Sequence, residues 1–180
     1  MKKRLFYALV FIPFILALIF TPSCSKKLDV DKMLSYQSAS RQDISLTLGE
    51  HTYPISLTLS DSSLDKLRDG VALITGGELE GIRFEMSKGS LKMTVHETEY
   101  LLGRNDCPSM YMLFGAFALT KDDFLGVTRE NGSDVMKARF KNTQELTLML
   151  DAESFEIKSI EAKCEDTDLK INFLTEIKED

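Results

Sequence analysis

The sequence has little of what enzyme active sites usually require. It contains only two histidines, His51 and His96, and neither stands in a pattern that pairs it with a nucleophile. There is no Gly-x-Ser-x-Gly nucleophile elbow, and no His-Glu-x-x-His or Cys-x-x-Cys spacing that would indicate a zinc site. Gly76-Gly77 is interpreted as a turn and not as a phosphate-binding loop. We therefore expect a non-enzymatic protein without catalytic residues, metal or cofactor.

Positive charge is also scarce. Lysine and arginine together number 22 against 28 aspartates and glutamates, and the formal net charge is −6. Lys2, Lys3 and Arg4 lie in a segment that we expect to be removed, so the mature chain is more acidic still. Such a chain is repelled by nucleic-acid phosphates and by anionic lipid head groups. Nucleic acid is therefore excluded as a partner, and membrane attachment has to come from the N-terminus.

The N-terminal segment has the parts of a signal peptide. A basic start is followed by an apolar run over 5–20 and by a short polar stretch before Cys24. The run is shorter than the roughly 20 residues that span a bilayer. We predict a signal peptide over 1–23 that ends at a lipidated Cys24. Cleavage without lipidation and an uncleaved anchor are the alternatives.

The surroundings of Cys24 resemble the signal of bacterial lipoproteins. Ser23 is the small residue expected before the modified cysteine, whereas the two residues before Ser23 depart from the usual Leu and Ala or Ser. The resemblance implies a diacylglycerol on the Cys24 sulfur, which would hold the protein at the extracytoplasmic face of a cell-envelope membrane. Residues 24–28 then form the lipidated cysteine and tether, and 29–180 form a single domain.

The two remaining cysteines are Cys107 and Cys164. An extracytoplasmic location permits a disulfide between them. The sequence does not determine whether their side chains approach within bonding distance. One disulfide and two free, partly buried thiols are both open at this point.

Most of the mature chain alternates between apolar and polar residues, which is typical of half-buried β-strands. Pro54 cannot donate a ladder hydrogen bond, so we expect its strand at a sheet edge or bulged there. The alternation predicts about nine or ten strands in a meandering antiparallel sheet, within a mainly β (α+β) fold. The alternating stretches, with 71–74 as a further strand, are 44–48, 53–59, 82–86, 91–95, 136–140, 146–150, 160–164 and 169–173.

Two short helices are predicted from their capping residues. Asp29 can cap a helix that begins at Val30. Thr120 and Asp123 can form a capping box for another helix, and Gly126 is placed to end it.

The segment Pro108–Leu119 breaks the alternation because it is apolar nearly all round. Asn105 or Asp106 can cap a helix there, and Pro108 suits its first turn. A helix that is apolar on all sides cannot lie on a surface, and this one is too short to cross a bilayer. We therefore expect a curved sheet, an incomplete β-barrel, to enclose it on the concave side.

Four stretches spread over the mature chain carry a family resemblance: Met33-Leu34-Ser35-Tyr36-Gln37, Glu78-Leu79-Glu80-Gly81-Ile82-Arg83-Phe84, Leu119-Thr120-Lys121-Asp122-Asp123-Phe124 and Asp151-Ala152-Glu153-Ser154. With the predicted architecture, they resemble the LolA/LolB-like superfamily, which includes the outer-membrane lipoprotein carrier and uncharacterised lipoproteins of Gram-positive bacteria. The resemblance implies an incomplete β-barrel with an apolar cavity. In some relatives the cavity carries acyl chains, and in others the fold serves as a protein-binding module.

Five apolar residues are candidates for lining such a cavity: Phe84, Met110, Leu113, Phe114 and Phe117. Methionine and phenylalanine side chains suit an irregular apolar ligand, and plain core packing is the other interpretation. Two functions follow. The chain is an envelope binding protein for an acyl lipid or another apolar ligand, or a module that docks another envelope protein through a sheet edge or its acidic surface.

Overall fold

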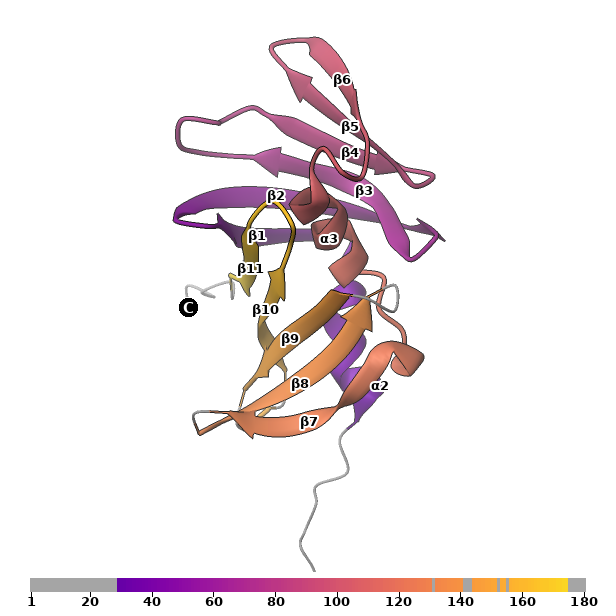
Figure 1. Ribbon diagram of the computed structural model, residues 1–180, viewed down its shortest axis with the longest axis vertical. Coiled ribbons are helices and arrows are strands. Elements are labelled where there is room, and N and C mark those ends of the chain that lie inside the picture. The colour runs from indigo at the N-terminus through magenta and orange to yellow at the C-terminus, as the bar shows by residue number, and fades with distance from the viewer. Residues whose placement is uncertain (1–28, 131, 141–143, 152, 155, 175–180) are drawn as a thin grey trace, which may run out of the picture.

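The computed structural model describes residues 29–174 except 131, 141–143, 152 and 155. The predicted signal peptide and Cys24 lie outside the described residues. Within the described part, the predicted mainly β fold is confirmed, because one antiparallel sheet that is not closed into a barrel dominates the structure (Figure 1). No helix of this part is long and apolar enough to cross a bilayer.

Eleven strands form this sheet, one or two more than the sequence predicts. The helical elements are short and are α2 (Val30–Met33), the 3-10 helix η1 (Leu34–Gln37), α3 (Pro108–Ala116) and the 3-10 helix η2 (Lys121–Asp123). The strands are β1 (Arg41–Leu48), β2 (His51–Leu64), β3 (Leu67–Ile74), β4 (Arg83–Ser87), β5 (Ser90–Val95), β6 (Thr98–Leu102), β7 (Phe124–Glu130), β8 (Ser133–Phe140), β9 (Gln144–Leu150), β10 (Ile157–Lys163) and β11 (Asp168–Phe173).

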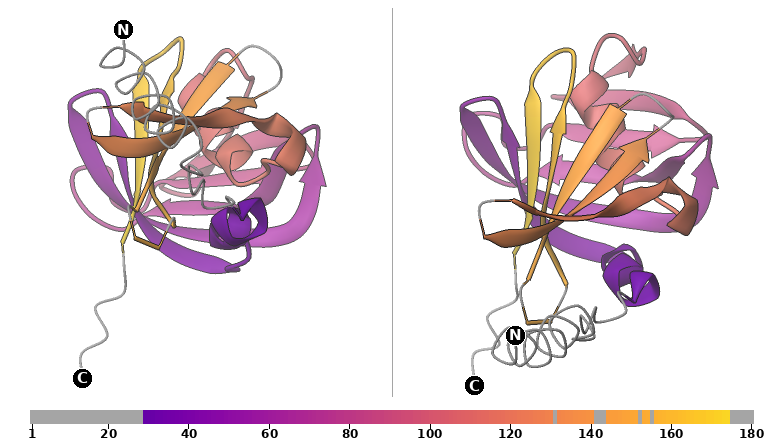
Figure 2. Two further views of the ribbon diagram at one scale, coloured as in Figure 1. Left: turned by 90° about the horizontal axis from the view of Figure 1, so that it is seen from below. Right: turned by 60° about the horizontal axis from the view of Figure 1, so that its bottom comes forward.

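The strand order is β6-β5-β4-β3-β2-β1-β11-β10-β9-β8-β7. Neighbours in the sheet are neighbours in the sequence except at the centre, where β1 pairs with β11 and Ile44 lies opposite Phe173. The sheet therefore consists of two meanders, β1–β6 and β7–β11, which are joined along one seam. The sheet curls so that the two meanders enclose α3 (Figures 1 and 2).

The apolar helix is enclosed as the sequence predicts. Every residue from Ser109 to Ala116 is buried, and the inward-facing side chains of the strands complete one continuous core around it. Gly115 permits the closest approach, because a Cβ atom at this position would lie 2.4 Å from the Phe140 ring on β8. Only glycine lets α3 pack this closely against the second meander.

The ends of the helices agree with the predictions only in part. Cys107, and not Asn105 or Asp106, is the N-cap of α3, because the Asp106 side chain accepts a hydrogen bond from the Gly103 N–H (2.6 Å). The α2 cap at Asp29 is confirmed. The Thr120–Asp123 capping box is also confirmed, but the helix ends at Asp123 and the chain continues directly into β7.

The prediction for Pro54 is wrong, since β2 lies inside the sheet between β1 and β3. The Pro54 carbonyl accepts a hydrogen bond from Thr75 N (2.9 Å), so its nitrogen also points to the β3 side. The ladder with β3 ends one residue away, at the pair of Ile55 and Ile74. Proline is tolerated here because no ladder donor is needed beyond that pair.

Candidate binding sites

The five candidate lining residues meet in the core. Phe84 is 9% exposed, and Met110, Leu113, Phe114 and Phe117 are each 2% exposed or less. They belong to one continuous cluster between the sheet and α3. Their side chains fill the concave side of the sheet, so the interior is packed in this conformation. Their role in ligand binding stays a prediction.

An aromatic cluster closes one end of this interior. Tyr36, Phe117 and Phe173 come from η1, the end of α3 and β11, and their ring centroids lie 5.3–6.0 Å apart in edge-to-face arrangements. The Tyr36 hydroxyl donates to the Ala116 carbonyl oxygen (2.6 Å). Burial raises the pKa of Tyr36 and the Gln37 hydrogen bond opposes this only in part, so the hydroxyl remains protonated. The cluster therefore fixes the end of α3 to two distant segments.

Polar groups in the interior are few and satisfied. Ser109, Asp123 and Ser159 are the buried polar residues, and every buried side-chain nitrogen or oxygen of the described part has a hydrogen-bond partner. Among the same residues, no group of three or more His, Cys, Asp and Glu side chains could hold a metal ion. His51 begins β2 and His96 lies in the turn before β6, both exposed.

The surface of the described part includes three open cavities that are not lined by any of the five candidate residues. The first, of about 700 Å³, is a groove on the outer face of β1 and β8–β11. The second, of about 730 Å³, lies between η1 and the ends of β1, β10 and β11. The third, of about 470 Å³, lies at the start of α3 beside the turn between β10 and β11.

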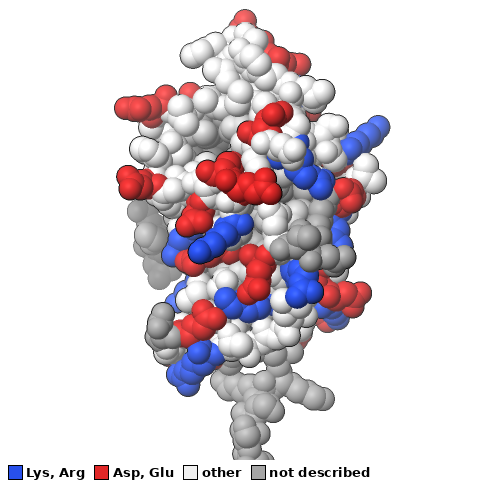
Figure 3. All heavy atoms as spheres, in the orientation of Figure 1, with Lys and Arg blue, Asp and Glu red and all other residues white. Residues whose placement is uncertain are grey.

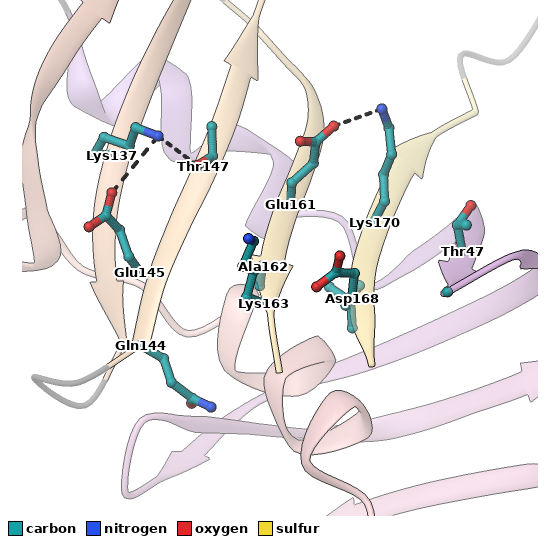
Figure 4. Close-up of a pocket in the computed structure, with 12 residues that line it drawn as sticks. Thr47, Lys137, Gln144, Glu145, Thr147, Glu161, Ala162, Lys163, Asp168 and Lys170 are labelled. Atoms are coloured by element: carbon teal, nitrogen blue, oxygen red, sulfur yellow. Dashed lines mark hydrogen bonds and ion pairs between the residues drawn. The ribbon is translucent and has the colours of Figure 1, made fainter. Parts of the chain in front are cut away.

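The outer groove is crossed by a row of polar side chains (Figure 4). One residue from each of five neighbouring strands lies in register, in the order Thr47, Lys170, Glu161, Thr147 and Lys137. Lys170 Nζ lies 2.7 Å from Glu161 Oε1, and Lys137 Nζ donates to Thr147 Oγ1 (2.9 Å). Lys137 Nζ also lies 3.8 Å from Glu145 Oε1 on β9, so the charged groups of the row are paired and the groove is best explained as a cross-strand network that stabilises the sheet.

The two edges of the sheet carry exposed apolar side chains. On β6, Leu101 is 79% exposed and Tyr100 is 47% exposed. On β7, Leu125 is 49% exposed and Val127 is 41% exposed. Neither strand is predicted from the sequence, because neither has the alternation of buried and exposed residues that reveals the others. The sheet edge was nevertheless one of the two binding surfaces expected from the sequence.

Cys107 and Cys164 are free thiols, both half-buried at the edge of the core. Cys107 caps α3, and Cys164 follows β10. Cys164 lines the same cavity as Pro108, the first residue of α3, so both cysteines lie near the start of this helix.

No protein-family model matches the chain, and no curated protein matches it in sequence. Among solved structures, it is similar to a putative outer-membrane lipoprotein-sorting protein domain from Vibrio parahaemolyticus (14% identity, 82% of this chain and 79% of that chain, TM-score 0.42). It is also similar to a LolA superfamily protein from Nitrosomonas europaea (12%, 77% and 71%, 0.42) and to the lipoprotein LppX from Mycobacterium tuberculosis (8%, 79% and 90%, 0.37). Such a likeness concerns the fold alone.

Proposed function

We propose that this chain is a non-enzymatic lipoprotein of the cell envelope that binds a partner polypeptide along β6, at one edge of its sheet. The observation that carries the proposal is the exposure of Leu101. It is 79% exposed on an edge strand, one residue before the strand ends, and more exposed than any other large apolar side chain of the described part. Exposed apolar groups on a strand edge invite pairing with another strand.

The turn before β6 determines which backbone groups point outward. His96 and Glu97 both have positive φ angles (46° and 69°), as in the type I′ turn of a two-residue hairpin. Thr98, next to such a turn, directs its N–H and C=O toward β5. Backbone groups alternate along a strand, so those of Glu99 and Leu101 point away from β5. They are available to an added strand.

The charge of the edge favours a basic partner. Residues 96–102 include two glutamates, Glu97 and Glu99, and no lysine or arginine. Lys92 on β5 lies 3.0 Å from Glu99 and partly offsets this charge. Around the upper end of the molecule, carboxylates border a largely uncharged surface (Figure 3). The partner segment is thus expected to be extended, with apolar and basic residues in alternation.

The proposed anchor would orient this edge. With a lipid on Cys24, residues 25–28 would span at most about 14 Å. The end of the domain that carries α2 would then lie close to the membrane. Since α2 and β6 lie at opposite ends of the long axis (Figure 1), β6 would face away from the membrane and toward other envelope proteins.

A cross-linking experiment in the producing cells tests the proposal. A photoreactive phenylalanine at position 101 of the full chain is expected to capture a polypeptide, and the same residue at Leu125 on β7 serves as the control. Leu101→Pro removes the N–H that an added strand needs, so we expect binding to fall at least about tenfold. Leu101→Ala keeps the N–H and should retain more of the binding.

The same cells also test the lipid anchor. Fractionation of the Cys24→Ser variant is expected to show that the protein has left the membrane fraction. Equal capture at positions 101 and 125, or undiminished binding by a folded Leu101→Pro variant, would contradict the edge proposal. Retention of the Cys24→Ser variant in the membrane would contradict the anchor.

A second candidate function is binding of an acyl chain or another apolar ligand beneath α3. The observation that favours it is the composition of the core, which contains the buried methionines Met33, Met86, Met110, Met112 and Met136. Methionine side chains adapt to new neighbours at small cost. An acyl chain would take over contacts that α3 makes with the sheet. Each methylene that it buries would contribute about 0.8 kcal/mol to the free energy of binding.

Fluorescence titration with a labelled sixteen-carbon fatty acid tests this second function. We expect saturable binding of one ligand per chain. Tyr111→Phe removes the hydrogen bond from the Tyr111 hydroxyl to the Leu102 carbonyl oxygen (3.0 Å). It should therefore loosen α3 and increase the affinity several-fold. Leu113→Asp should abolish uptake. A folded wild-type protein that binds no fatty acid would rule this function out.

A further inference from the structure

We propose that Cys107 and Cys164 form a disulfide when the chain folds in an oxidising compartment, and that this bond fastens the start of α3 to the turn between β10 and β11. The bond would form whichever ligand or partner the protein binds. It would join two residues that lie far apart in the sequence and that the fold brings to one end of α3.

The position of the turn follows from one carboxylate. Asp166 Oδ2 accepts hydrogen bonds from the Ser109 N–H (3.3 Å) and from the Ser109 hydroxyl (2.8 Å). Cys107 precedes Ser109 by two residues, and Cys164 precedes Asp166 by two residues. The hydrogen-bonded pair therefore brings both cysteines to within two residues of one contact.

The surroundings of the two thiols agree with this placement. Cys107 Sγ lies 4.0 Å from the Ser109 hydroxyl oxygen. Cys164 N donates to the Thr167 carbonyl oxygen (3.2 Å), which closes the turn that carries Asp166. Pro108, adjacent to Cys107, and Cys164 line the same cavity of about 470 Å³. Cys164 and the neighbour of Cys107 thus border one space at the start of α3, and the disulfide requires the two sulfur atoms to rotate toward each other there.

The reaction is an ordinary thiol–disulfide exchange with a disulfide oxidant of the envelope. One cysteine thiolate attacks the oxidant and releases its first sulfur as a thiol. The second cysteine then loses its proton, displaces the remaining oxidant thiol and closes the Cys107–Cys164 bond. Two protein thiols are oxidised, and one disulfide of the oxidant is reduced to two thiols.

Burial determines when this exchange is fast. It raises the pKa of both thiols, that of Cys164 to about 12, and the carboxylate of Asp166 adds to the effect. Little thiolate is present at neutral pH in the folded protein, so the bond should form during folding rather than afterwards. The same high pKa makes these sulfurs poor leaving groups. Once formed, the bond should resist reduction.

The test is oxidative refolding of the full chain carrying Cys24→Ala, so that only the two thiols in question remain. The chain is unfolded, then refolded in mixed reduced and oxidised glutathione, and its free thiols are counted after denaturation. We expect none, together with one linked peptide pair joining positions 107 and 164. The bond closes a long loop, so the Tm should be about 10 °C higher than in reductant.

Matched variants keep the result interpretable. In the Cys24→Ala background, Cys107→Ser and Cys164→Ser should each retain one thiol. Each variant should show the same Tm with and without reductant. A double serine variant that refolds in the same buffer shows that the conditions permit folding. Two free thiols in the refolded Cys24→Ala protein, or bonds only between separate chains, would overturn the proposal.

Discussion

Replacing Phe117 with alanine is expected to lower the free energy of unfolding by about 4 kcal/mol. The ring is 1% exposed and lies between Tyr36 and Phe173, so its removal leaves a cavity where α3 meets η1 and β11. The loss of two edge-to-face contacts adds to the cost of the lost burial. Urea denaturation followed by near-ultraviolet circular dichroism measures the change.

The control for this prediction is Leu125→Ala. Leu125 is 49% exposed on β7, so the same kind of truncation there should cost less than about 0.5 kcal/mol. Phe117→Leu retains most of the apolar volume and should give an intermediate loss. Equal losses for Phe117→Ala and Leu125→Ala would show that the aromatic cluster does not hold α3 in place.

Replacing Asp123 with alanine is expected to cost about 3 kcal/mol. Asp123 is 5% exposed, and its carboxylate accepts hydrogen bonds from Thr120 N and Thr120 Oγ1, both at 2.8 Å. It also pairs with Lys66 in the turn between β2 and β3. The substitution therefore removes the cap of η2 and its link to the first meander. Asp122→Ala, at an exposed neighbour, is the control.

The effect of Asp123 should depend on pH. Burial alone would raise the pKa of this carboxyl, but Lys66 and the Thr120 hydrogen bonds outweigh burial and lower it below the ordinary value. In the unfolded chain the ordinary pKa is about 3.9. The stabilisation is thus complete above about pH 5 and is lost as the pH falls through the lower, folded-state value. The stability difference between the wild type and Asp123→Asn should therefore shrink between pH 6 and pH 3. A constant difference over this range would contradict the ion pair.

The sequence predicts those parts of the fold in which a strand has one face buried and the other exposed. Ile44 and Leu46 on β1 and Leu169 and Ile171 on β11 alternate with polar residues because each strand has one side on the core. The edge strands β6 and β7 escape detection because almost all of their residues are exposed. Apolar and polar residues alternate only where one face of a strand is buried. An edge strand that projects beyond the core buries little surface on either face.

The candidate sites were predictable to a smaller extent. An apolar helix such as α3 implies an enclosing layer, since water excludes it, but the sequence does not state whether space remains inside. The meeting of Ser109 with Asp166 depends on how the second meander folds back onto α3. Contacts of this kind join distant parts of the chain and leave no periodic pattern. That Cys107 and Cys164 lie near the same contact is therefore apparent from the structure and not from the sequence.

The seam between β1 and β11 has a consequence for the order of assembly. Each meander is built from strands that follow one another, whereas Ile44 reaches Phe173 only after all the intervening strands have been made. Pairings between such distant residues form slowly, because the entropy of closing the loop must be overcome first. In the export proposed for this chain, β1 would wait with one side unpaired until β11 emerged from the membrane channel. That interval is when the nascent molecule is most prone to aggregation and most in need of a chaperone.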